Sequence, residues 1–246
     1  MNKINLFIIG TQKGGTTALA EFLSQHSDIY VTDGKEAHVF DDPSLSRCND
    51  SIDLAYRHLL SKYNNESVIC DATPIYMYFG DIPKKLYEYN PSARLIVILR
   101  EPSERAFSQY QMERRRGDEP LSYPKALLAE VKRLREDSNP YQHGSSHRLH
   151  SYRSRGHYCR QLDNVFSVFS RAQVLLLTND ELRYHHDVTI NKITRFLDVN
   201  NEPVVSSTVF SGEYKATLKE SITSKVLRLY FFPERVRLWR RYGVRL

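Results

Sequence analysis

A glycine-rich segment near the start of the chain, GTQKGGTT at residues 10–17, has the composition of an anion-binding turn. Its G-x-x-x-x-G spacing is one at which backbone N–H groups converge on a phosphate. Gly14 and Gly15 let the backbone approach a ligand closely, and the hydroxyls of Thr16 and Thr17 can donate hydrogen bonds to phosphate oxygens. The segment therefore predicts a site for a phosphate-like anion.

The position of the lysine separates this segment from ATP-binding loops. In a Walker loop a lysine directly precedes the Ser/Thr and reaches the β- and γ-phosphates. Thr16 stands at that place here, and the lysine is Lys13, inside the loop. The sequence therefore disfavours a P-loop kinase or NTPase with an atypical phosphate loop, although this alternative stays open beside a purely structural turn.

A second candidate anion site follows the strongest apolar run of the chain, LIVIL at residues 95–99. Arg100 comes directly after this run, and Ser108 lies eight residues later, within an expected helix. A guanidinium fork and a hydroxyl can converge on one phosphate. The alternatives are a structural salt-bridge cluster of Arg100 with Glu101 and Glu104, and a serine that is plain helix surface.

The elements that must position these groups follow from the hydrophobic pattern. Buried strands are expected at four short apolar runs, residues 6–9, 67–71, 95–99 and 174–177. Amphipathic helices are expected after the glycine segment, after Pro102 and over residues 188–197. This alternation predicts an α/β fold, a P-loop-like three-layer sandwich with a central parallel sheet flanked by helices. Ligands of such sheets bind at the carboxyl ends of the strands, where both candidate anion sites fall.

Length and composition fit a single domain over residues 1–246, or at most two small ones, with 41% hydrophobic residues that suffice for a packed core. The three cysteines are scattered without a C-x-x-C pair, which favours a reducing compartment and argues against structural zinc. The first apolar run is too short for a signal peptide, and no run approaches the roughly 18 residues of a membrane span. We therefore expect a cytoplasmic protein.

Two regions differ from the rest in polarity. Residues 111–157 are polar and contain several Gly and Pro, which predicts a substrate-side insertion that is mostly exposed loop with one helix at 126–134. Metal binding by its four clustered histidines is a minor alternative to a solvated loop; they are His143, His147, His150 and His157. Residues 215–246 carry nine Lys/Arg and two Glu, which predicts a basic C-terminal helical tail that either touches an anionic surface or is simply solvated.

Three blocks of the sequence together resemble the sulfotransferases that use 3′-phosphoadenosine 5′-phosphosulfate (PAPS). TQKGGTTAL, residues 11–19, is similar to their 5′-phosphosulfate loop, and LIVILREPSERAFSQY, residues 95–110, to their 3′-phosphate site. KEAHVF, residues 35–40, is similar to the K-E-x-H-x-F segment of the carbohydrate-acting branch, which includes the heparan sulfate sulfotransferases. GHYCRQL at residues 156–162 and the NDEL and TINKITRFLDV segments extend the resemblance to about residue 200.

The resemblance implies that PAPS is the co-substrate and that no metal is required. The 5′-phosphate would be held by the glycine loop, that is by Lys13, Gly14, Gly15, Thr16 and Thr17. The 3′-phosphate would be held by Arg100 and Ser108. The implied enzyme transfers a sulfuryl group to a hydroxyl or amine of a carbohydrate or of a glycosylated or other small-molecule acceptor.

The resemblance also implies the catalytic groups. Glu36 would be the general base that takes the proton of the acceptor. Lys13 would stabilise charge that develops on the leaving nucleotide, and His38 would orient Glu36, contact substrate or act as a second acid/base group. A surface ion pair between Glu36 and Lys35 is the alternative.

The sequence departs from the heparan-acting members at three places, of which Glu101, in place of the usual aspartate after Arg100, is a mild change. Residues 71–76 read DATPIY, with Ala72 where those members carry a lysine that contacts saccharide, which disfavours a heparan-like polyanionic acceptor. No lysine-glycine-rich run follows residue 200, so Lys215 or Lys219 would have to replace it on the 3′-phosphate. A basic nucleic-acid-binding protein is a further alternative, but no nucleic-acid module is recognisable and no such partner is expected.

Overall fold

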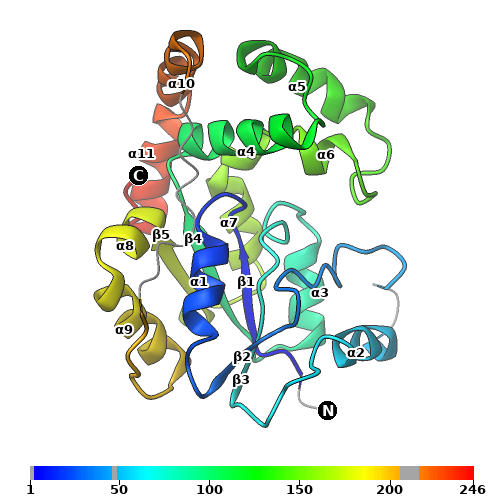
Figure 1. Ribbon diagram of the computed structural model, residues 1–246, viewed down its shortest axis with the longest axis vertical. Coiled ribbons are helices and arrows are strands. Elements are labelled where there is room, and N and C mark those ends of the chain that lie inside the picture. Colours follow the sequence, from blue (N-terminus) through cyan, green and yellow to red (C-terminus); the bar gives the residue numbers. More distant parts are fainter. Residues whose placement is uncertain (1–2, 46–48, 206–215) are drawn as a thin grey trace. The chain divides into compact units, whose positions relative to one another are not determined.

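The computed structural model describes residues 3–45, 49–205 and 216–246 (Figure 1). The chain forms two compact units. Unit 1 comprises residues 1–99 and 161–211, and unit 2 comprises residues 100–160 and 212–246. The prediction of a single domain over the whole chain stays a prediction.

Unit 1 contains a five-stranded, all-parallel sheet in the order β2-β3-β1-β4-β5. The strands are β1 Leu6–Gly10, β2 Ile29–Val31, β3 Val68–Asp71, β4 Arg94–Leu99 and β5 Val174–Thr178. Its helices are α1 Thr16–Leu23, α2 Asn49–Arg57, α3 Ile82–Tyr89, α8 Asn179–Tyr184 and α9 His186–Leu197, with the 3₁₀ turn η2 Arg171–Gln173. Because all strands run in one direction, the segments that follow them leave the sheet at the same edge.

Both faces of this sheet are covered. Leu6 and Ile8 of β1 pack on one face with α1, α8 and α9, in a core that also holds Ile98 and Ile193. Phe7 points to the other face, where its ring meets those of Phe40, 5.8 Å away, and of Tyr89 on α3, 6.4 Å away. Helices on both faces of a parallel sheet confirm the predicted three-layer α/β sandwich.

The four strands expected from sequence are confirmed, and the fifth, β2, was missed. β2 has only three residues, so its apolar run is too short for a periodicity argument. The helix after the glycine segment, the helix after Pro102 and the helix that ends at Leu197 are also confirmed.

Unit 2 is helical. It contains α4 Pro102–Arg116, α5 Tyr123–Glu136, α6 Ser146–Leu149, the 3₁₀ turn η1 Ser154–Gly156, α10 Leu218–Tyr230 and α11 Phe232–Tyr242, while α7 Tyr158–Phe166 begins in unit 2 and ends in unit 1. Its core joins residues of α4, α5 and α10, among them Tyr110, Tyr123 and Leu227, with Tyr152 from the segment before η1 and Phe231 directly after α10. The predicted helical tail is confirmed for residues 218–242.

The prediction that residues 111–157 are mostly exposed loop was wrong. α4 extends to Arg116 and α5 covers residues 123–136, longer than the expected helix. Glu119 and Glu130 are buried, where they accept hydrogen bonds from Arg133 and Arg153 at 3.1 Å. Charge was therefore a poor guide to exposure here, because paired carboxylates and guanidinium groups can be buried together.

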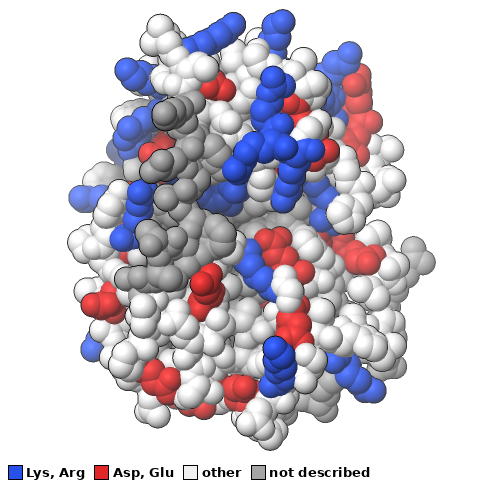
Figure 2. All heavy atoms as spheres, viewed as in Figure 1, with Lys and Arg blue, Asp and Glu red and all other residues white. Residues whose placement is uncertain are grey.

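The two units differ in charge. Unit 1 carries 13 Lys/Arg and 18 Asp/Glu, a net of −5, and unit 2 carries 22 Lys/Arg and 11 Asp/Glu, a net of +11. Figure 2 shows dense Lys and Arg side chains over the helices of unit 2. The excess positive charge of the chain therefore belongs to unit 2, and it extends beyond the tail.

Candidate active site

The glycine loop between β1 and α1 is fixed by backbone contacts within unit 1. Thr11 N donates to Ile98 O and Gly14 N donates to Thr11 O, both at 2.8 Å. A Cβ at Gly14 would lie 2.5 Å from Ile98 O, so no other residue fits there without moving backbone. Asn179 of α8 also holds the loop, because its Nδ2 donates to Gly14 O at 2.7 Å. The loop is therefore a preformed cradle.

The cradle ends in a helix N-terminus that can accept an anion. Gly15, with φ +110°, is the N-cap of α1 and offers no side chain to the first N–H groups of the helix. These groups have no partner within the helix and carry the positive end of its dipole. Thr16 is buried and Thr17 is exposed at the first two helical positions. This geometry suits a phosphate group.

The segment that follows β2 brings together four ionisable side chains. Lys35 Nζ lies 2.7 Å from Glu36 Oε1, and His38 Nε2 lies 3.3 Å from Glu36 Oε2. His38 Nδ1 lies 2.9 Å from Oδ2 of Asp41, whose side chain is fully buried. The imidazole therefore bridges a buried carboxylate and a carboxylate that is 34% exposed.

These contacts determine the protonation states. Partial burial opposes ionisation of Glu36, but the hydrogen bond from His38 and the charge of Lys35 outweigh it and lower the pKa of Glu36 to about 2. Burial also opposes the charge on His38, but Asp41 and Glu36 outweigh it and raise the pKa of His38 to about 9. At neutral pH the pair is therefore a carboxylate held by an imidazolium, and the surface pair of Glu36 with Lys35 is also present.

A buried carboxylate at the end of β3 holds this segment in place. Asp71 is fully buried and accepts hydrogen bonds from the hydroxyls of Tyr56, Thr73 and Tyr76, at 2.7, 2.6 and 3.0 Å. Thr73 Oγ1 in turn accepts from the backbone N–H of His38, and the hydroxyl of Tyr76 accepts from that of Phe40, both at 3.3 Å. Burial raises the pKa of Asp71 to about 6 in spite of these bonds.

Strained backbone marks both segments. Lys13, Lys35 and His38 have φ of 68°, 70° and 53°, in the left-handed region that non-glycine residues rarely adopt. Among the described residues only two further non-glycine positions share this property, Asn65 and Asp198. Such strain accumulates at functional sites because the surrounding structure must hold it.

The order of the strands places the glycine loop and the Glu36 segment near each other. The loop follows β1 and the Glu36 segment follows β2, and β3 lies between these strands. Neighbouring strands are about 4.8 Å apart, so the two segments leave the sheet about 10 Å from each other. One edge of one sheet thus carries Lys13, Gly14, Gly15, Thr16, Thr17, Glu36 and His38. Sequence had placed the glycine loop at such an edge, but not Glu36 or His38, because strand β2 was missed.

Arg100 and Ser108 belong to unit 2. The guanidinium of Arg100 donates from Nε and Nη2 to Glu104 Oε2 at 3.2 Å, so the predicted ion pair is present. Glu101 takes no part in it; this carboxylate caps α4 by accepting from the N–H groups of Ser103 and Glu104 at 3.0 Å. Ser108 is 6% exposed on α4, so it is not plain helix surface.

The structure also shows where the residues that depart from the heparan-acting pattern lie. Ala72 is fully buried in the core of unit 1, where a lysine ammonium would lack water. Lys219 is exposed on α10, and Lys215 lies outside the described residues.

The histidines of residues 143–157 do not converge. His147 Nε2 lies 3.2 Å from Leu134 O, His150 Nε2 lies 3.1 Å from Asp118 O, and His157 Nε2 lies 3.2 Å from the Tyr230 hydroxyl. In the part of the chain that the structure describes, no group of three or more His, Cys, Asp or Glu could hold a metal ion. The metal-site alternative therefore gains no support.

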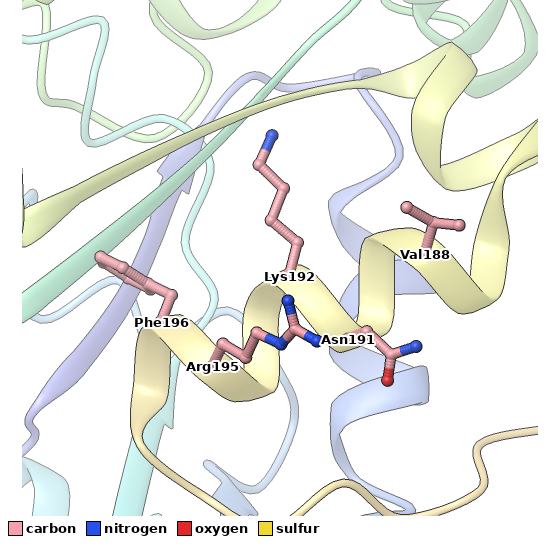
Figure 3. A pocket seen from close by; sticks show the side chains of 5 residues that line it. All are labelled: Val188, Asn191, Lys192, Arg195 and Phe196. Atoms are coloured by element: carbon pink, nitrogen blue, oxygen red, sulfur yellow. The ribbon is translucent and has the colours of Figure 1, made fainter.

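A surface hollow of about 580 Å³ lies over α9, and none of the predicted site residues is among the residues that line it (Figure 3). Its lining comes from that helix alone, from Val188, Asn191, Lys192, Arg195 and Phe196. Lys192 is already engaged, with Nζ 3.3 Å from Glu181 Oε1. We assign the hollow over α9 no role in the site.

Four supporting residues were missed by sequence reasoning, Asp41, Asp71, Thr73 and Asn179. Asp71 and Asn179 directly end or follow strands β3 and β5, which is the position that had singled out Arg100. Asp41 stands three residues after His38, a spacing that could have suggested a partner. The contacts of Thr73 link segments 35 residues apart, and no local signal points to them.

Comparison with known proteins identifies the family to which the chain is similar. The family model described as sulfotransferase domain matches residues 3–225. A sulfotransferase from Alicyclobacillus acidocaldarius has the same fold with a TM-score of 0.82 and 27% identity, over 100% of this chain and 98% of that one. The mouse sulfotransferase SULT7A1 complexed with PAP has a TM-score of 0.58 at 14% identity, over 99% and 87%.

Among curated proteins, heparan sulfate glucosamine 3-O-sulfotransferase 6 of Mus musculus is 37% identical over 103 residues. That match covers 42% of this chain and 28% of the mouse enzyme, so the similarity spans little more than a quarter of the relative. No helix within the described residues is long and apolar enough to cross a bilayer. With a family model that matches nearly its whole length, the chain belongs to the sulfotransferase domain family.

Proposed function

We propose that the protein transfers a sulfuryl group from PAPS to a hydroxyl or amine of a carbohydrate or small-molecule acceptor. The observation that carries this proposal is the pairing of the preformed glycine cradle with the Glu36–His38–Asp41 chain at one edge of the sheet. An anion site and an ionised carboxylate are the two elements that a transfer from a phosphosulfate to a hydroxyl needs.

The glycine loop fits the 5′-phosphate of PAPS, because its backbone excludes a Cβ at Gly14 and its helix N-terminus lacks a side-chain cap. PAPS would supply the activated sulfuryl group. Lys13 would place positive charge beside the bridging oxygen, and Arg100 with Ser108 would hold the 3′-phosphate. To do so, the guanidinium of Arg100 has to break its ion pair with Glu104 and bind the phosphate instead.

Glu36 would accept the proton of the acceptor hydroxyl or amine. Its carboxylate is ionised and accessible, but it is a weak base while Lys35 and His38 both stabilise its charge. Contacts that draw the ammonium of Lys35 away would raise the pKa of Glu36 toward the range useful for proton transfer. His38, held by buried Asp41, would fix the carboxylate in position.

A carbohydrate acceptor is supported by the KEAHVF segment and by the partial match to a heparan sulfate glucosamine 3-O-sulfotransferase. The buried Ala72 speaks against recognition of a heparan-like polyanion through this position. A screen of glycan and small-molecule acceptors with radiolabelled PAPS would identify the acceptor.

Calorimetric titration tests the nucleotide part of the proposal. We expect adenosine 3′,5′-bisphosphate to bind and ATP with Mg²⁺ to bind more weakly. Tighter binding of ATP–Mg²⁺ would favour the kinase or NTPase alternative, and absence of bisphosphate binding would refute the proposal.

The variant Glu36→Gln tests the base. We expect transfer to fall by at least about 100-fold, the lower end of the usual contribution of a general base, with bisphosphate affinity unchanged. Glu88→Gln is the matched control, because Glu88 also pairs with a lysine, Lys84 at 3.7 Å, on α3. If Glu36→Gln keeps full transfer activity, Glu36 is not the base.

A further inference from the structure

Helix α10, Leu218–Tyr230, has two apolar faces. One faces the core of unit 2: Leu227 is 4% exposed, and Phe231 directly after the helix is fully buried. Both pack against aromatic residues of α4 and α5, including Tyr110 and Tyr123. The protein itself covers this face.

The opposite face is a row of four large aliphatic side chains exposed to solvent. Leu218, Ile222, Val226 and Leu229 are exposed by 80%, 55%, 61% and 74%. Their spacing keeps them within about 80° of the helix circumference, on the far side from Leu227. Singly exposed apolar residues are ordinary, but a continuous row of four on one helix indicates an interaction surface. We call this row the α10 strip.

Positive charge borders the α10 strip. Lys219 and Lys225 are exposed and flank the strip on its two sides, about 20° beyond its edges on the helical wheel. The next helix, α11, also exposes large apolar side chains, Phe232 by 59% and Trp239 by 47%. The guanidinium carbon of Arg245 lies 4.8 Å from the centre of the Trp239 ring. Aliphatic residues between lysines, followed by an exposed tryptophan beside arginine, match the composition of interfacial helices.

We propose that the α10 strip docks onto an anionic lipid surface. Its aliphatic side chains enter the boundary between headgroups and acyl chains, and Lys219 and Lys225 pair with lipid phosphates. A nucleic acid would satisfy the lysines but leave four aliphatic side chains without an apolar partner. A second copy of the chain on a two-fold axis would bring these lysines near their own equivalents. The proposal does not rest on the sulfuryl-transfer activity.

Flotation with lipid vesicles tests the proposal on the full chain. We expect binding to phosphatidylcholine vesicles that contain phosphatidylglycerol, weaker binding when salt is raised, and little binding to phosphatidylcholine alone. Lys219→Gln with Lys225→Gln should weaken binding about 30-fold, since each basic residue near an anionic surface contributes about fivefold. Ile222→Ser with Val226→Ser should weaken it by at least about tenfold.

The matched control is Leu128→Ser with Val131→Ser on α5. Those two side chains are also aliphatic and exposed, by 78% and 52%, but they lie on another helix of unit 2. The control should bind vesicles like the unchanged protein, and circular dichroism should show every variant folded. If Ile222→Ser with Val226→Ser does not fold, Leu229→Ser alone is used, with an expected loss of about threefold.

Three results would overturn the proposal. The first is that the control weakens vesicle binding as much as the α10 variants do. The second is a dimer in sedimentation velocity that the Ile222 and Val226 changes abolish while vesicle binding is absent. The third is salt-dependent binding of duplex DNA that only the lysine changes remove, again without vesicle binding.

Discussion

The two proposed phosphate sites of this protein are built in different ways. The glycine loop in unit 1 is made of backbone: Gly14 has no room for a Cβ, and Asn179 fixes its carbonyl. The Arg100 and Ser108 site in unit 2 is made of side chains on and before one helix, and Arg100 is already paired with Glu104. A backbone cradle is ready before its ligand arrives, whereas a paired arginine must change partners. We therefore expect the first site to fail abruptly on mutation and the second to respond gradually.

The largest effect is expected for Gly14→Ala. The new methyl group would lie 2.5 Å from Ile98 O and 2.8 Å from Thr11 O. Ile98 O can move only if strand β4 shifts, and Thr11 O can move only if the glycine loop shifts. We expect adenosine bisphosphate affinity to fall about 100-fold, as for the loss of one or two charge-assisted hydrogen bonds, and stability by about 1–3 kcal/mol. Calorimetry and thermal unfolding measure both.

Gly117→Ala is the control for this change. Gly117 has a φ of +87°, and a Cβ there meets nothing within 4 Å, so the change adds backbone strain without a steric clash. It should cost about 1 kcal/mol of stability and leave nucleotide affinity intact. Equal affinity losses in both variants would contradict the preformed cradle.

Arg100→Ala should reduce bisphosphate affinity about 10- to 30-fold. Hydrogen bonds to charged groups contribute about 1.5–3 kcal/mol, but the arginine must first break its ion pair with Glu104, which lowers its net contribution to binding. Glu104→Gln tests the same site in the opposite direction, because it removes the ion pair that holds the guanidinium of Arg100. We expect it to tighten binding by up to about fivefold, the most that such an exposed pair contributes. A loss of affinity in Glu104→Gln would show that the pair positions Arg100 for binding.

Asp71→Asn addresses how the Glu36 segment is held. Burial raises the pKa of Asp71 to about 6, above its unfolded value of 3.8, so its contribution to stability is present below pH 4 and is lost as pH rises through 6. We expect the unchanged protein to lose up to about 3 kcal/mol of unfolding free energy across this interval, and Asp71→Asn to lack that fall. Denaturant titration between pH 4 and 7 measures it, and identical profiles would contradict the assignment.

The smallest effect is expected for His38→Gln. The pKa of His38 is raised to about 9 by Asp41 and Glu36, above its unfolded value of 6.5. Its contribution to stability is therefore present below pH 6.5 and is lost as pH rises through 9. Because the imidazole is 43% exposed, solvent screens the effect and we expect only a shallow slope. Loss of that slope in His38→Gln, but not in His150→Gln of unit 2, would confirm its origin.

Local sequence predicted the parts of the site that depend on local geometry. The cradle at residues 10–17 needs glycines at fixed positions after a strand, and Arg100 needs only to follow an apolar run, so both could be identified before the fold was known. The burial of parts of residues 111–157 could not be predicted, because Glu119 and Glu130 pair with arginines that lie 14 and 23 residues away in the sequence. Charge patterns do not reveal such pairs.

By itself the sequence determined four of the five strands, the glycine loop, the pairing of Glu36 with Lys35 and the net charge of the tail, since each depends on neighbouring residues or on short periodicity. Only the tertiary structure decided that Asp71 holds the Glu36 segment through Thr73 and Tyr76, that Ala72 is core and that one face of α10 is left exposed. Those facts depend on contacts between segments far apart in the chain, which are determined only when the whole chain packs.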